Sequence, residues 1–142
     1  YCINAVFTEK VIINDRNSNN ILNPKSGYNL KYLLAVINSR LLSFWFVRMF
    51  DKFQRKIFPQ FKVNELARFP IYPADYKQQG VIIDLVDKIL QLNEKLRGLE
   101  KSSNRWNSLK SEVEKIDKKI DGEVYKLYGL TPEEIAIVEN QK

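Results

Sequence analysis

Basic and amide side chains gather in the middle of the chain, from Arg40 to Lys62. This stretch holds six lysines and arginines and a single acid, Asp51. Arginine and glutamine can make bidentate hydrogen bonds to base edges, and lysine and arginine bind phosphates. The composition therefore favours contact with duplex DNA. The predicted DNA-contacting residues are Arg48, Lys52, Gln54, Arg55, Lys56, Gln60 and Lys62.

The segment from Phe53 to Lys62 mixes cations, amides and aromatic residues around Pro59. Such a mixture is a poor helix and a poor central strand, so we expect an exposed loop. Its apolar residues can anchor the loop while its polar residues face outward. Two plainer interpretations stay open: the aromatic residues only anchor a loop, and the charges only solvate a basic surface.

Net positive charge is confined to the first part of the chain. Residues 1–80 hold 12 lysines and arginines against 5 acids, whereas the remaining 62 residues hold 11 against 12. A concentrated positive surface attracts a polyanion, and a balanced surface is merely soluble. The first part is therefore the predicted binding part, and double-stranded DNA is its predicted partner.

The sequence lacks the residues of most catalytic sites. It has no histidine and a single cysteine, which excludes within this chain a Ser-His-Asp triad, a Cys-His pair, a His-ligated zinc and an internal disulfide. No glycine-rich phosphate loop is present, and Asn-Pro-Lys at residues 23–25 differs from the Asn-Pro-Pro-aromatic motif of adenine-N6 methyltransferases. We expect no catalytic residue, no metal site and no bound cofactor in this chain.

Hydrophobic patterns predict an α+β fold for the first part. Ala5 to Asn14 is rich in β-branched residues and predicts a strand, and Ile21-Leu22 can add a short one. Asn29 can cap a helix whose apolar positions repeat at helical spacing as far as Met49. The stretch Phe69 to Pro73, with its two prolines, predicts an edge strand. We expect a small mixed sheet with one buried helix.

The second part is predicted to hold two amphipathic helices and a short third one. Apolar residues recur at three- and four-residue steps from Gln79 to Leu99 and again from Trp106 to Leu127. Helices joined by so short a turn should pack as an antiparallel hairpin. Thr131-Pro132-Glu133-Glu134 is a capping box that opens a short C-terminal helix. The predicted division is residues 1–78, the α/β part with the basic loop, and residues 79–142, the hairpin and capping helix.

Apolar runs in the chain are well short of a membrane span of roughly 18 residues. The chain begins at Tyr1 without a signal-peptide pattern, so we interpret it as part of a longer polypeptide. A lone cysteine suits a reducing compartment. We expect a cytoplasmic protein that does not bind a membrane.

Five motifs in a fixed order carry a resemblance to a known family. They are YNLKYLLAVINSRLL at residues 28–42, FPQFKVNEL at 58–66, FPI at 69–71, IIDLVDKIL at 82–90 and IDGEVYKLYGLT at 120–131. In this series the chain resembles the TaqI-like C-terminal specificity domain of bacterial type IIG restriction-modification enzymes. It resembles the type I restriction specificity subunit more distantly.

The resemblance implies a target recognition domain that reads a DNA sequence and positions the rest of its polypeptide there. That rest would be an adenine-N6 DNA methyltransferase using S-adenosylmethionine, with an endonuclease activity using Mg2+, and the helices would dock against the methyltransferase. Both cofactors would bind outside this chain, and the chain would be a monomer. By the same resemblance Gln60 and Lys62 face DNA, whereas Asn38 and Ser39 serve helix packing.

A helical protein-protein assembly module with no direct contact to nucleic acid is the alternative. The apolar stripes of the hairpin could continue onto a partner helix, and the basic part could only aid solubility. Such a module should associate with itself or a partner through contacts that salt does not weaken. A recognition domain should bind DNA less tightly as salt rises.

Overall fold

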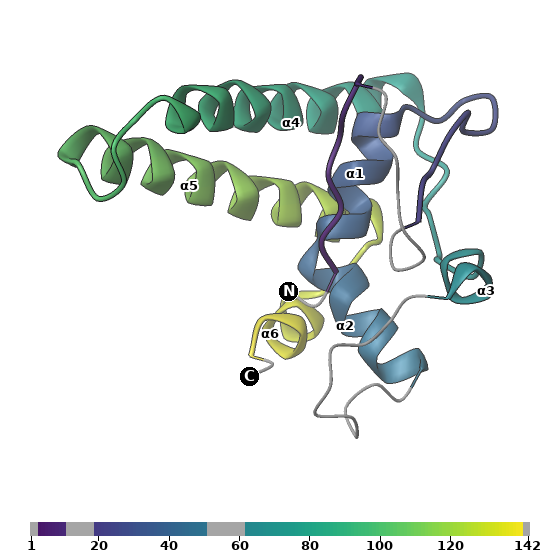
Figure 1. The fold of residues 1–142 in the computed structure, drawn as a ribbon. Helices are drawn as coiled ribbons and strands as arrows, with labels where there is room; N and C mark the ends of the chain where they lie inside the picture. The colour runs from purple at the N-terminus through teal and green to yellow at the C-terminus, as the bar shows by residue number, and fades with distance from the viewer. Residues whose placement is uncertain (1–2, 11–18, 51–61, 141–142) are drawn as a thin grey trace.

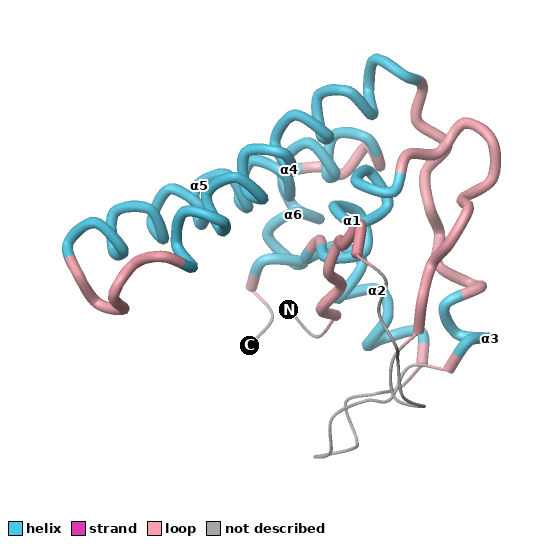
Figure 2. Tube along the Cα trace, turned by 45° about the horizontal axis from the view of Figure 1, so that its top comes forward, coloured by secondary structure: helices cyan, strands magenta, loops and turns pink. Residues whose placement is uncertain are grey.

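The computed structural model describes residues 3–10, 19–50 and 62–140, and these form six α-helices. The helices are α1 (Leu30–Asn38), α2 (Arg40–Met49), α3 (Val63–Leu66), α4 (Tyr76–Arg97), α5 (Asn104–Leu127) and α6 (Pro132–Glu139). α4 and α5 lie side by side as a long hairpin, and α1 crosses the base of this hairpin (Figure 1). α2 leads away from α1, with α6 beside it and α3 at the same end of the molecule (Figures 1 and 2).

The prediction of an α+β fold with a small mixed sheet is wrong, because the described residues contain helices and no strand. Residues 3–10 run alongside α1 (Figure 1). The backbone of Ala5 forms hydrogen bonds with the side-chain amide of Asn38 and not with a neighbouring strand. The Ala5 amide donates to Asn38 Oδ1 at 2.7 Å, and Asn38 Nδ2 donates to the Ala5 carbonyl at 2.9 Å. The rest of the predicted strand Ala5–Asn14, from residue 11 onward, lies outside the described residues.

The two other predicted strands are also absent from the described residues. Ile21-Leu22 forms no strand, and the two side chains are 45% and 75% exposed. Phe69 to Pro73 is irregular, because its two prolines have no amide to donate to a sheet. Tyrosine hydroxyls bind this backbone instead: the Tyr72 amide donates to Tyr128 Oη at 3.0 Å, and Tyr128 Oη donates to the Pro70 carbonyl at 2.6 Å.

The single buried helix predicted from Asn29 to Met49 is two helices that meet at Ser39 with a bend of 64°. Asn29 caps α1 as predicted, since its side chain accepts from the Lys31 amide at 2.8 Å. Ser39 ends α1 and starts α2: its hydroxyl donates to the Val36 carbonyl at 2.7 Å and accepts from the Leu42 amide at 3.2 Å. A serine that caps the second helix cannot also continue the first, which explains the break.

The predicted hairpin and C-terminal helix are confirmed. α4 begins three residues earlier than predicted, because Asp75 and Gln78 form a capping box. α5 is capped by Ser103, and Gly129 follows it with a positive φ of 67° that suits glycine. α6 begins with the predicted capping box of Thr131 and Glu134, with Pro132 at its first position.

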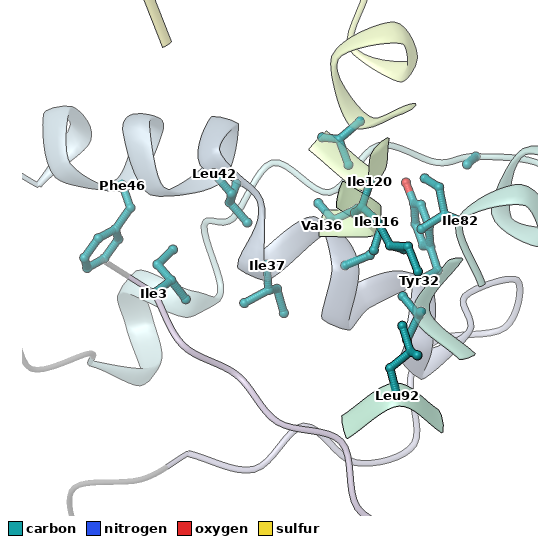
Figure 3. Close-up of a cluster of buried hydrophobic side chains, with 14 residues drawn as sticks. Ile3, Tyr32, Val36, Ile37, Leu42, Phe46, Ile82, Leu92, Ile116 and Ile120 are labelled. Atoms are coloured by element: carbon teal, nitrogen blue, oxygen red, sulfur yellow. The ribbon is translucent and has the colours of Figure 1, made fainter. Parts of the chain in front are cut away.

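One hydrophobic core joins α1 and α2 to the base of the hairpin (Figure 3). Its fully buried side chains include Tyr32, Val36 and Phe46 from the first helices, Ile82 from α4 and Val124 from α5. Ile3 adds the N-terminal segment to the same core. Among the described residues no single helix has the length and apolar composition of a membrane span; only the bent α1–α2 pair meets that test, by length and composition alone.

Candidate nucleic-acid interface

Four aromatic rings close the end of α2 against the segment that follows α3. Trp45 lies edge-on to both Phe50 and Phe69, with ring centroids 5.8 Å and 5.7 Å apart. Phe46, which is fully buried, contacts the same two rings at 5.4 Å and 5.8 Å. Such aromatic pairs each contribute about 0.5–1.5 kcal/mol beyond their buried area. The cluster therefore ties the end of α2 to the chain beyond α3.

Two arginines lie over aromatic rings at this end of the molecule. The guanidinium carbon of Arg48 is 4.3 Å from the centre of the Phe44 ring, and that of Arg68 is 5.2 Å from the centre of the Phe50 ring. Both arginines are exposed. A cation above a ring is attracted by the ring quadrupole, which restrains the side chain without removing its charge. Both guanidinium groups are thus restrained by a ring on residues that are exposed.

Lys62 adds a third exposed cation at the start of α3. Its amide donates to Glu65 Oε2 at 3.1 Å, and Glu65 is buried with 8% of its surface exposed. The Glu65 carboxylate thus serves the backbone at the helix N-terminus, where a negative charge is favourable. Among the described residues no acid pairs with the Lys62 ammonium group.

The predicted DNA-contacting residues divide into two groups. Arg48 and Lys62 are described, and they lie on the two segments that the aromatic cluster joins. The other five lie outside the described residues, in the stretch 51–61; they are Lys52, Gln54, Arg55, Lys56 and Gln60. Their contacts with DNA stay a prediction.

A buried carboxylate holds the opposite end of α2. Asp121, on α5, is 3% exposed and accepts a hydrogen bond from the Arg40 amide at 2.9 Å. The same carboxylate pairs with Arg40 Nε at 3.5 Å. An acid at a helix N-terminus stabilises the exposed amides there. Asp121 therefore sets the start of α2 against the hairpin, and α2 carries Arg48 near its other end.

The Tyr125 hydroxyl lies one turn beyond Asp121 and is buried without a hydrogen-bond partner in the described part of the chain. Burial raises the pKa of Tyr125 above its ordinary value, and the nearby Asp121 charge raises it further. The phenol is therefore neutral at physiological pH.

A cavity of about 90 Å³ lies between α1, α4 and α5. Its polar lining comes from Asn38 and Ser39 on one side and from Asp117 and Asp121 on the other. Asn38, Ser39 and Asp121 already serve the backbone contacts described above. In the described ranges no group of three or more potential ligands could hold a metal ion.

Arg68 is the basic residue of this surface that the sequence prediction missed. It stands three residues after Glu65, and this spacing on a helical turn suggests a local ion pair that would neutralise it. The structure shows Glu65 bound to the Lys62 amide instead. The signal that could have found Arg68 is the capping role of Glu65 at the third position of α3, which makes it a poor partner for Arg68.

Comparison with known proteins finds a family match. Residues 2–71 match the family described as the TaqI-like C-terminal specificity domain. The matched region includes α1, α2 and α3, together with Arg48, Lys62 and Arg68. The hairpin lies outside it, as do the sequence motifs at residues 82–90 and 120–131. No curated protein and no solved structure matches the chain.

Proposed function

We propose that this chain has a role in DNA sequence recognition. Its residues 2–71 belong to the TaqI-like C-terminal specificity domain family, which recognises DNA sequence in restriction-modification enzymes. The chain is the target recognition part of a type IIG enzyme and positions the catalytic parts of the same polypeptide on its DNA site. One structural observation supports the proposal most. The exposed cations Arg48, Lys62 and Arg68 lie on two segments that an aromatic cluster fixes together, on both sides of residues 51–61.

The proposed contacts divide the work between phosphates and bases. Cations that bind phosphates fix the register of a protein on duplex DNA. Phosphate contacts carry no sequence information. We assign this role to Arg48 and Lys62, and to Lys52, Arg55 and Lys56 in the intervening stretch. Base reading falls to residues of that stretch that can make bidentate contacts; they are Gln54, Arg55 and Gln60.

The hairpin has a different proposed role. α4 and α5 carry nearly balanced charge and reach beyond the core that holds their base (Figure 1). We propose that they dock against an adenine-specific methyltransferase of the same polypeptide, which uses S-adenosylmethionine, in a monomeric cytoplasmic enzyme. Any endonuclease activity would use Mg2+, and the proposal places both cofactors outside this chain.

Fluorescence anisotropy with random duplex DNA across a salt series tests the proposal. Each protein cation that neutralises a phosphate releases counterions, so the logarithm of the affinity should fall linearly with the logarithm of the salt concentration. We expect binding at low salt and a steep decline. Absence of binding even at low salt would contradict the proposal and favour the helical assembly module.

A further inference from the structure

We infer that Arg68 is a further DNA phosphate contact, mounted on the ring of Phe50. The inference rests on the proposed DNA-binding function and adds a residue that neither the sequence pattern nor the family match assigns. Three observations carry it: the ring that holds the guanidinium, the acid that does not pair with it, and the place of Arg68 on the segment that the aromatic cluster joins to α2.

The ring beneath Arg68 is held on two sides. Phe50 lies 5.8 Å from Trp45 and 5.4 Å from Phe46, centroid to centroid, and the guanidinium carbon of Arg68 lies 5.2 Å from the Phe50 centroid. The attraction between a cation and a ring does not neutralise the guanidinium charge, so the charge stays available to an anion. A restrained side chain also loses less conformational entropy when it binds.

Within the described ranges, Arg68 forms no ion pair with Glu65, the acid three residues before it, whereas Arg97 pairs with an acid at the same spacing. Arg97 and Glu94 are three residues apart on α4 and form an ion pair of 3.1 Å. Arg68 and Glu65 have the same spacing, but Glu65 is buried and accepts from the Lys62 amide. In the described part of the chain no carboxylate pairs with Arg68. Its charge is therefore available to an external anion.

The planar guanidinium selects the chemistry of that anion. Its fork of donors matches two oxygens of a phosphate group, and it is less strongly hydrated than an ammonium ion. Arg68 is tied to the segments that carry the other two cations. Its partner ring, Phe50, follows α2, which carries Arg48, and Arg68 itself follows α3, which begins after Lys62. A phosphodiester backbone that contacts the end of α2 and the start of α3 then has a further basic residue on the segments that the aromatic cluster joins.

The test compares Arg68→Ala with Arg105→Ala in the 142-residue chain, by anisotropy on random duplex DNA across a salt series. Arg105 is a matched control. It is exposed, and Arg105→Ala removes the same charge, but Arg105 lies in the first turn of α5 within the hairpin. We expect Arg68→Ala to lower the salt slope by about one and Arg105→Ala to leave it unchanged. Equal slopes for the two variants would overturn the inference.

Arg68→Lys separates charge from structure. Lysine also contacts phosphates as a point charge, so this variant should keep most of the slope that Arg68→Ala loses. A slope as low as that of Arg68→Ala would mean a structural role and would also overturn the inference. If wild-type chain shows no salt-dependent binding, the proposed function itself fails.

Discussion

At the scale of single residues, side chains take over hydrogen bonds that the sequence pattern assigns to a sheet. Asn38 binds both backbone groups of Ala5, and Tyr128 binds the backbone around Tyr72. Propensity predicts an extended backbone but not the partner that pairs with it, so three strands were predicted where the described residues have none. Local capping was predictable, because Asn29 and Thr131 act on residues two and three positions away.

The triple variant Arg55→Ala, Lys56→Ala, Lys62→Ala tests the predicted loop contacts. We expect weaker DNA binding and a flatter salt dependence, since up to three phosphate contacts are removed. The thermal midpoint should stay nearly unchanged, because surface substitutions usually change stability by less than about 0.5 kcal/mol. Anisotropy and thermal unfolding measure the two effects. Unchanged affinity would refute the assignment of these residues to the interface.

Stability should fall at alkaline pH because of buried tyrosines. Burial raises the pKa of Tyr32, Tyr125 and Tyr128 above the ordinary tyrosine value near 10. Above that pH the unfolded chain loses phenolic protons that the folded chain keeps, so the free energy of unfolding decreases as pH rises. The contribution of these tyrosines to stability is complete below a pH of about 10. Urea unfolding from pH 7 to pH 11 measures this decline.

Tyr125→Phe should reduce this alkaline decline. The substitution also removes a buried hydroxyl without a described partner, so we expect the variant to be as stable as the wild type or slightly more stable at pH 7. Tyr76→Phe is the matched control, because Tyr76 is 86% exposed. An undiminished alkaline decline in Tyr125→Phe would show that Tyr125 does not contribute to it.

At the scale of elements, the long amphipathic helices were predictable and the break between α1 and α2 was not. The hairpin follows from apolar residues at helical spacing over many turns. The helix from Asn29 to Met49 has the same apolar spacing, but Ser39 interrupts it with a cap. The cap is completed by Asp121, which is 81 residues away from Arg40 in the chain. No local pattern reveals so distant a partner.

Asp121→Ala should destabilise the chain by about 2 kcal/mol, because it removes charged hydrogen bonds at a buried helix start. The cost stays below that of a fully buried pair, because the Arg40 side chain is 39% exposed and can be hydrated. Urea unfolding measures it. Glu123→Ala on the same helix is the control: its pair with Lys126 is largely exposed, so the loss should be under about 1 kcal/mol. Equal losses would contradict the anchoring role.

At the scale of the whole molecule, the charge asymmetry follows directly from the sequence, and its role in DNA binding stays a prediction. The positive part contains α1, α2 and α3, and three of its exposed cations, Arg48, Lys62 and Arg68, lie at the end of α2 and around α3. The core was harder to predict, because it joins Tyr32 and Val36 to Ile82 and Ile120 across the predicted boundary at residue 78. Hydrophobic periodicity indicates which face of each helix is buried, but not which helices bury it together.

Selection from a pool of randomised duplex DNA tests the central claim, DNA sequence recognition, most directly. The 142-residue chain is incubated with the pool at moderate salt, and bound DNA is recovered and sequenced over several rounds. Base contacts each discriminate by about 1–3 kcal/mol, so the account predicts enrichment of one short sequence. A bound pool as random as the starting pool would contradict it.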